Sequence, residues 1–352
     1  RDPEMSRGLG DVYKRQIYNF QEAGMTDLSA WQNDTYFVLQ KNEREIVAVN
    51  LQDRDAAVEE ALKTGKIVEG AICYTFDISD PNETKYTLDY YMKKAKEIEA
   101  MGCHILTIKD MAGLLKPYAA KTLITELKKE LNIPVNLHTH DTTGSGVSTI
   151  LMAAEAGVDI ADMAIESMSS LTSQPSMNTI VSTLKGTERD TKLDINELHE
   201  LSEYYARVRE VYKPFESGMC TPNSEIYKYE IPGGQYSNLL AQVKEMGEKD
   251  RFEDIKRLYK EANDLLGNIV KVTPTSKVVG DLAIFMFKNN LDKDNILTDG
   301  KDLSYPESVV EYFKGMIGQP DGGFPEEFQK IVLKGICLLY TSDAADDRIS
   351  VD

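Results

Sequence analysis

From residue 69 onward, the sequence alternates short apolar segments with amphipathic ones, and this alternation constrains the fold more than any other feature. Apolar segments typical of buried strands lie at 69–75, 104–110, 134–140 and 160–167. Between the first two, apolar residues recur at helical spacing, and Gly102 follows where a helix C-cap is expected. This pattern predicts a parallel sheet, in either a singly wound βα barrel or a doubly wound sheet. Periodicity alone does not distinguish the two.

After about Gly186 the strand pattern gives way to long, charged, amphipathic segments, such as 195–212 and 252–270. Apolar residues at helical spacing indicate helices whose charged faces meet solvent. Turns rich in glycine and proline interrupt these segments at 231–234 and 322–323. The second half of the chain is therefore predicted to be a mainly α-helical domain.

The ends of the chain differ in character from the sequence between them. Residues 1–16 and 336–352 resemble translated sequencing adapters, so we expect foreign tails without function. Residues 17–60 do not match the pattern that follows them. We expect the organised part of the chain to divide into a barrel segment, 61–186, and a helical segment, 187–335.

The charge of the chain limits its partners. Its 352 residues include 40 basic and 58 acidic side chains, a formal net charge of -18 at pH 7. This surface would repel nucleic acid and anionic lipid, so we expect neither a nucleic-acid nor a membrane partner. No apolar run approaches the roughly 20 residues that span a bilayer, and the N-terminus lacks the apolar core of a secretory signal. We therefore expect a cytoplasmic protein.

Two histidines stand at the end of the third predicted strand. His138 and His140 are two residues apart, so on a strand their imidazoles point to the same face. Barrel active sites lie at the carboxyl ends of the strands, where such a pair can bind one metal ion. On the pair alone, two histidines bonded within the core or a loop remain the preferred interpretation.

Lys109 occupies the equivalent place at the end of the preceding strand. A protonated amine repels a metal cation, so Lys109 can be a ligand only after carbon dioxide converts its amine into a carboxylated, anionic group. From the residues alone, an ion pair with Asp110 or with another carboxylate at the strand ends is preferred.

Five separated motifs then identify a family. They are KDMAGLLKP (109–117), HTHDTTG (138–144), MSSLTSQPS (168–176), IPGGQYSNL (231–239) and VTPTSKVVGD (272–281). In this order they resemble the carboxyltransferase domain of biotin-dependent pyruvate carboxylases, and the resemblance continues through residues 305–335. It implies an α/β fold, a (β/α)8 TIM barrel of which only the C-terminal half is clearly present, followed by a mainly α-helical domain.

The resemblance also marks where this chain departs from the family. The first four barrel strands, which carry an aspartate metal ligand and an arginine that binds pyruvate, are not recognised in residues 17–60. Phe76 stands in the motif YTFD where the family has glycine. A large side chain there is expected to crowd a tight turn at the strand end.

For the metal, the resemblance implies that Lys109 is an N6-carboxylysine ligand, with His138 and His140 as the imidazole ligands of a zinc or manganese ion. This replaces the ion pair preferred above for Lys109.

For catalysis, the resemblance implies that Thr273 shuttles a proton between pyruvate and biotin. Ser276 and Lys277 would hold the biotin ureido ring, and Gln235 would help to form that pocket. Read without the resemblance, residues 273–276 are a turn or a helix N-cap.

The implied function is carboxyl transfer from carboxybiotin to pyruvate, giving oxaloacetate, which is the second half-reaction of pyruvate carboxylase. Biotin would be attached to a carrier domain outside this chain, and ATP would be used only by an absent biotin carboxylase domain. The resemblance also implies a homo-oligomer, a tetramer in the intact enzyme.

Two alternatives stay open. One is the carboxyltransferase subunit of an oxaloacetate decarboxylase or transcarboxylase, which the motifs HTHDTTG, GGQYSN and TSK fit less well. The other is a catalytically incomplete fragment with only an assembly role.

Overall fold

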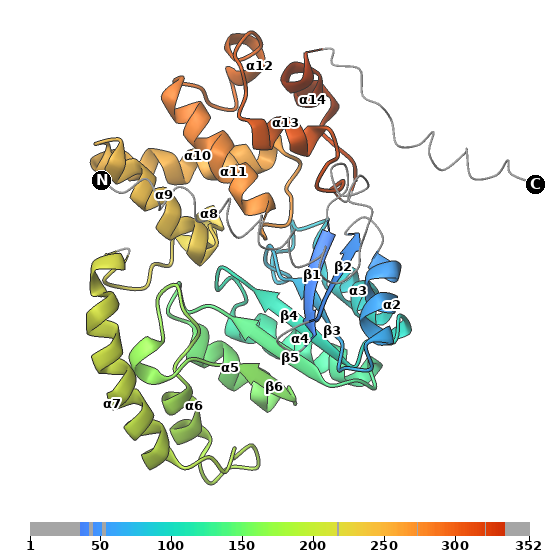
Figure 1. Ribbon diagram of the computed structural model, residues 1–352, viewed down its shortest axis with the longest axis vertical. Helices are drawn as coiled ribbons and strands as arrows, with labels where there is room; N and C mark the ends of the chain where they lie inside the picture. Colours follow the sequence, from blue (N-terminus) through green and yellow to red (C-terminus); the bar gives the residue numbers. More distant parts are fainter. Residues whose placement is uncertain are drawn as a thin grey trace, which may run out of the picture.

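Four parallel strands form the sheet on which the described part of the chain is built (Figure 1). The computed structural model describes residues 36–41, 45–50, 54–216, 218–272, 274–320 and 322–334. The strands, in their order across the sheet, are β3 (Glu69–Cys73), β4 (Ile105–Asp110), β5 (Val135–Thr139) and β6 (Ile160–Asp162). Each strand neighbours the next one along the chain, so winding continues in one direction, as in a βα barrel. A doubly wound sheet would reverse its strand order.

Helices cover one face of this sheet because the strands present apolar residues on that side. The covering helices are α3 (Leu88–Ala100), α4 (Pro117–Glu130) and α5 (Gly146–Glu155). Leu106 and Ile108 of β4 and Leu137 of β5 are fully buried in the same core as Leu123 and Ile124 of α4. Burying each such side chain contributes roughly 1.5–3 kcal/mol. The predicted helix that opens at Pro117 is confirmed, and so is Gly102 just beyond the end of α3, with a φ of +90°.

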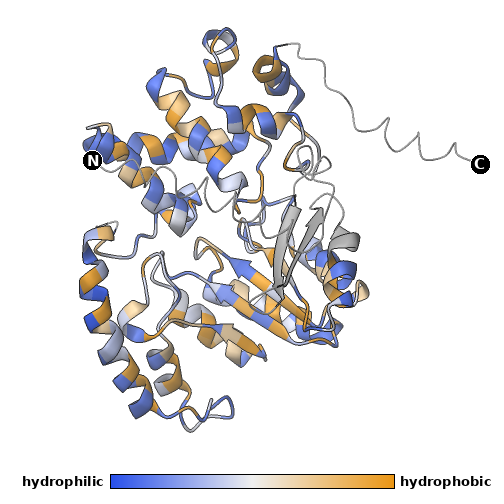
Figure 2. Ribbon diagram, in the orientation of Figure 1, coloured by the Kyte–Doolittle hydropathy of each residue, from blue (hydrophilic) through white to orange (hydrophobic). Residues whose placement is uncertain are grey.

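The other face of the sheet is polar. Hydrophilic and hydrophobic residues alternate along β4 and β5 (Figure 2), as period-two strands with unlike faces require. Asn136 Nδ2 donates to Glu69 Oε1 at 3.2 Å and lies 3.4 Å from Asp162 Oδ1, and the Thr107 hydroxyl also donates to Glu69. These bonds join all four strands on the face that a closed barrel turns inward.

A separate two-stranded antiparallel sheet lies in the segment that did not fit the predicted pattern. It consists of β1 (Tyr36–Lys41) and β2 (Glu45–Asn50), followed by α2 (Arg54–Lys63). An antiparallel hairpin is not a βα unit, which agrees with the mismatch seen in the sequence.

Beyond the sheet the described chain is helical, as predicted. The longer helices are α6 (Met177–Leu184), α7 (Ile195–Tyr212), α9 (Gly233–Glu245), α10 (Phe252–Leu265), α11 (Thr275–Lys288) and α14 (Glu326–Leu333). Between them lie the shorter η3 (Glu166–Met168), η4 (Lys213–Phe215), α8 (Ile226–Tyr229), η5 (Lys249–Arg251), α12 (Ile296–Asp299) and α13 (Glu307–Phe313). Within the described residues, no helix combines the length and apolar character needed to cross a bilayer.

The helical region docks on the carboxyl ends of the strands. The Gly233 amide donates to the Met111 carbonyl after β4 at 3.2 Å, and the Asn223 amide donates to the Thr142 carbonyl after β5 at 2.8 Å. The Tyr86 hydroxyl, in the connection after β3, donates to the Asn268 carbonyl at 2.7 Å. A site at this edge is therefore walled by both regions.

Phe76, three residues after the end of β3, adopts the left-handed backbone conformation that favours glycine, with a φ of +62°. Its ring is accommodated nevertheless. It stacks on Tyr86 with the ring centroids 5.4 Å apart, and the ammonium groups of Lys260 and Lys271 lie 4.6 and 4.7 Å from its centroid. The turn is strained, but contacts with both regions hold the side chain in place.

We expect Phe76→Gly to destabilise the fold less than Phe76→Ala, by about 1 kcal/mol, because only glycine relieves the left-handed backbone. Both variants lose the ring contacts, so both should unfold at lower denaturant concentration than the unaltered chain. Urea unfolding followed by circular dichroism measures the difference. An alanine variant as stable as the glycine variant would contradict a strained turn.

Candidate functional site

The parallel register places four side chains in one row across the sheet, near the carboxyl ends of the strands. From β3 to β6, the row consists of Cys73, Lys109, His138 and Asp162. Residues paired across neighbouring strands point to the same face. Lys109 and His138, predicted to share a metal, are therefore direct neighbours on the polar face of the sheet.

Both candidate histidines use the same ring nitrogen to bond to the protein. His138 Nδ1 lies 2.9 Å from Asp162 Oδ2, and His140 Nδ1 lies 2.7 Å from the Thr172 carbonyl oxygen. With Nδ1–H donating in each ring, the lone pair of Nε2 is free for another partner. Metal-bound histidines commonly donate their second N–H to a carboxylate or a backbone carbonyl. The two ring centroids are 5.3 Å apart.

The protonation of His140 also suits a ligand. Burial lowers the pKa of His140, and the nearby His138 and Lys109 lower it further, whereas the bond to Thr172 opposes this shift. A neutral imidazole has the Nε2 lone pair that a metal requires. The arrangement of donors thus fits a zinc or manganese ion held by two imidazoles.

A third ligand for the metal would have to come from a residue type other than His, Cys, Asp or Glu. Within the described residues, no group of three or more His, Cys, Asp or Glu side chains is placed to hold a metal ion. Lys109 is the neighbour of His138 in the row, and within the residues that the structure describes no ion pair joins Lys109 to a carboxylate. A carboxylated Lys109 would supply the missing oxygen donor.

Asp110, the other partner considered for Lys109, points to the opposite face and is fully buried. Its carboxylate accepts hydrogen bonds from the amides of Leu114 and Leu115, at 2.8 and 2.9 Å, and from the Thr139 hydroxyl at 2.8 Å. Burial raises the pKa of this carboxyl group, while the three bonds favour its ionised form. Asp110 therefore shapes the turn after β4 and does not neutralise Lys109.

The turn after β4 packs tightly against the loop after β5. Gly113 has a φ of +69°, and a Cβ atom there would lie 2.6 Å from the His140 carbonyl oxygen, so only glycine fits. The Thr143 hydroxyl donates to the Gly113 carbonyl at 3.0 Å. The first two motifs of the sequence thus form one unit beside the histidines.

The proposed biotin residues lie on the helical side of the same edge, and they do not all come together. Thr273 lies outside the described residues. Ser276 is buried in the first turn of α11, and the Gln235 side chain packs directly against Gly280, one turn further along that helix. Lys277 instead is 68% exposed, and its ammonium pairs with Asp281 at 2.8 Å. Gln235 and Ser276 are therefore associated with the same helix, while Lys277 is turned toward solvent.

Sequence reasoning missed two groups that orient the histidines. Asp162 lies near the start of the fourth apolar segment, and an acidic residue in an otherwise apolar predicted strand was a usable signal, because a carboxylate commonly supports a metal-bound histidine. Its register with His138 is known only from the structure. The Thr172 carbonyl had no such signal, because backbone contacts between distant loops leave no trace in the sequence.

Comparisons with known proteins find similarity along most of the chain. The family model described as HMGL-like matches residues 15–204, and the one described as a conserved carboxylase domain matches residues 226–348. The pyruvate carboxylase of Bacillus subtilis (strain 168) is 53% identical over 279 residues, which cover 79% of this chain and 24% of that protein. The mitochondrial pyruvate carboxylase of Homo sapiens is 47% identical over 282 residues, covering 79% and 24%.

Solved structures are also similar to this chain. The carboxyl transferase domain from Rhizobium etli pyruvate carboxylase matches with a TM-score of 0.78 and 44% identity, over 80% of this chain and 47% of that one. The same domain with pyruvate and biocytin matches equally well, with the same TM-score, identity and coverage. The chain spans about a quarter of the length of the curated relatives, 24% for the Bacillus subtilis protein.

If Asp162 orients His138 for a metal, we expect Asp162→Ala to weaken Zn²⁺ binding by about 10- to 100-fold. Asp162→Asn should retain part of the affinity, because its amide oxygen still accepts from Nδ1–H. Competition with a chromophoric chelator measures both. The control is Asp159→Ala. Asp159 lies just before β6, and its carboxylate accepts bonds from Lys128 and from the Val135 amide. Equal weakening by the control would contradict a specific role for Asp162.

Proposed function

The chain belongs to the HMGL-like family and to the carboxyltransferase domains of the pyruvate carboxylase family, and from this premise we propose that it transfers the carboxyl group of carboxybiotin to pyruvate, giving oxaloacetate. The observation that carries the proposal is the pair His138 and His140, whose Nδ1 atoms both bond to the protein, while no described residue bonds to either Nε2 atom. Lys109 stands opposite His138 on the neighbouring strand. That arrangement suits one metal ion at the carboxyl ends of the strands.

His138, His140 and carboxylated Lys109 would hold zinc or manganese. When bound, the metal supplies positive charge where negative charge develops on the oxygen of the substrate. The Lys109 amine reacts with carbon dioxide to form a C–N bond and releases one proton, which leaves an anionic carbamate oxygen as a ligand. Asp162 and the Thr172 carbonyl hold the imidazoles in the tautomer that this requires.

The helical region would hold biotin. Ser276 would donate to the ureido oxygen of carboxybiotin, assisted by Lys277, and Gln235 would form the adjoining wall. Removing water from this oxygen promotes the release of carbon dioxide from carboxybiotin. Ser276 suits this role because it is buried in the first turn of a 14-residue helix. Lys277 would have to exchange its bond with Asp281 for one to the ligand.

Thr273 would carry the proton between the two reactants. Pyruvate loses a proton from its methyl group to the Thr273 hydroxyl, which passes its own proton to the biotin nitrogen that has just lost the carboxyl group. The resulting enolate carbon attacks carbon dioxide, and the new C–C bond gives oxaloacetate. A neutral hydroxyl can perform this relay because it gives up one proton as it receives the other.

Several partners would lie outside this chain. Biotin would arrive on a carrier domain, ATP would be used only by a biotin carboxylase domain, and the intact enzyme would be a homotetramer. The reaction assigned to the 352 residues is therefore only the carboxyl-transfer step.

We expect His138→Ala and His140→Ala each to remove nearly all zinc or manganese from the purified protein, because each deletes one of the few available donors. Mass spectrometry of the metal content is the measurement. His199→Ala, which alters an exposed histidine on α7, is the control and should retain the metal. Folded unaltered protein without metal would contradict the proposed centre.

We expect Thr273→Ala to lower the rate of biotin-dependent oxaloacetate decarboxylation by about 10²- to 10⁴-fold, the usual contribution of a proton-transferring group. Thr273→Ser should retain much of the activity because it keeps the hydroxyl. Neither change should alter the metal content. The control is Thr298→Ala, at an exposed position in α12. An alanine variant with full activity would exclude the shuttle.

A further inference from the structure

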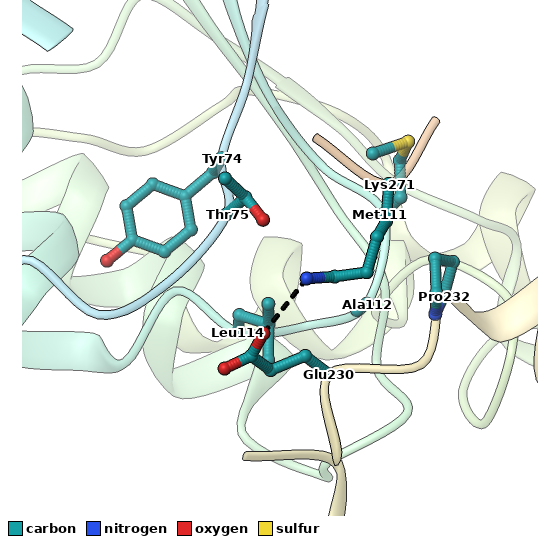
Figure 3. Close-up of a pocket in the computed structure, with 8 residues that line it drawn as sticks. All are labelled: Tyr74, Thr75, Met111, Ala112, Leu114, Glu230, Pro232 and Lys271. Carbon is teal, nitrogen blue, oxygen red and sulfur yellow. Dashed lines mark hydrogen bonds and ion pairs between the residues drawn. The ribbon is translucent and has the colours of Figure 1, made fainter. Parts of the chain in front are cut away.

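A buried ion pair lies between the sheet and the helical region. Lys271 Nζ is 2.9 Å from Glu230 Oε2, and the two side chains are only 3% and 9% exposed. Lys260 Nζ approaches the other carboxylate oxygen of Glu230 at 3.1 Å. Figure 3 shows the Lys271 side chain extended toward Glu230 across a pocket. The proposed reaction uses neither residue.

The pair links the two loops that lead into the helices carrying the proposed biotin residues. Glu230 ends α8 in a left-handed conformation, with a φ of +57°, and leads into the turn that opens α9 and carries Gln235. Lys271 lies in the loop that leads into α11, where Ser276 stands. The Thr275 hydroxyl ties this loop together. Its oxygen lies 2.6 Å from the Val270 carbonyl oxygen and 2.5 Å from that of Val272, so its one proton is donated to one or shared between them, and it accepts a bond from the Val272 amide at 3.1 Å. Because Glu230 and Lys271 each belong to one of these two loops, the ion pair fixes the position of one loop relative to the other.

The segment after β3 covers the ion pair from a third side. The ring of Phe76 lies within 4.7 Å of both ammonium groups, and such cation–π contacts favour the charged lysines. Beside the ion pair is a cavity of about 10 Å³, lined by residues that include Thr75 and Met111 (Figure 3). The ion pair is thus screened from solvent where the sheet and both loops meet.

Stability alone is a weak reason to keep such a pair. Burial lowers the pKa of Lys271, and the attraction of Glu230 opposes that shift. In many proteins, replacing a buried ion pair with neutral side chains of similar size costs little, whereas removing one partner is strongly destabilising. A pair that links two loops at a site can instead specify their relative position.

We propose that the Glu230–Lys271 pair, covered by Phe76, is a positioning clamp that sets the Gln235 turn and the start of α11 in the arrangement needed to hold biotin. The proposal rests on the proposed function, because it assigns biotin to these loops. Glu230 and Lys271 act through the loops and do not touch the reactants.

The test compares Lys271→Met with the double variant Glu230→Gln/Lys271→Met. The single variant removes the ammonium group 2.9 Å from Glu230, so that Glu230 keeps only its ion pair with Lys260. The double variant removes the buried charges of both clamp residues. If the pair positions the loops, the double variant should regain thermal stability but not biotin binding. Its KM for free biotin in oxaloacetate decarboxylation should stay about 10- to 100-fold above that of the unaltered protein.

The matched control is Lys256→Met. Lys256 is also 3% exposed and paired, with Glu225 and with Glu253 at 2.7 Å, but it lies on α10, outside both loops. We expect this variant to lose stability while its KM for biotin stays within twofold. If Lys256→Met raises the KM as much as Lys271→Met, or if the double variant regains both stability and biotin binding, the clamp is overturned.

Hydrogen exchange separates a failed clamp from a failed function. The amides of Val272 and Ser276, which bond within the Lys271 loop, should exchange faster in both clamp variants than in the control. Unchanged exchange overturns the clamp even if biotin binding falls. Faster exchange in a protein whose unaltered form does not use biotin overturns the proposed function, and with it the role assigned to the clamp.

Discussion

The register of the parallel strands is the constraint on which the rest of the site depends. Once β4 pairs with β5 so that Lys109 stands opposite His138, the side-chain period of two sends both to the polar face. The same register brings Asp162 to His138, and it turns Asp110 to the opposite face, where its carboxylate organises the turn after β4. A shift of one residue would exchange the two faces and bury Lys109 among leucines.

The helical region completes the site by docking on the carboxyl ends of those strands. Its contacts are mostly backbone hydrogen bonds from turns, such as Gly233 to Met111 and Asn223 to Thr142. Because these bonds are directional, they orient the turns as well as attach them. Gly233 also packs against Thr172, whose carbonyl holds His140, so the start of α9 and the histidine pair share one support.

Much of the fold could be predicted from the sequence because local patterns determine it. The four strands, the helix that opens at Pro117 and the glycine after α3 all follow from periodicity and capping. Winding direction was different: the spacing allowed two folds, and only the observed order β3–β4–β5–β6 selects single winding. Strand order depends on contacts between segments distant in the chain, which a local pattern does not record.

The candidate site divides in the same way. The sequence by itself determined that a lysine and two histidines stand near the ends of two consecutive predicted strands and that the chain carries five motifs of one family. Residue identity and spacing are written along the chain. Only the tertiary structure decided that Asp162 and the Thr172 carbonyl engage the two Nδ1 atoms, that Lys277 turns toward Asp281, and that Phe76 covers an ion pair between loops. The physical reason is that hydrogen bonds and ion pairs depend on distances of about 3 Å between atoms far apart in sequence, and folding alone sets those distances.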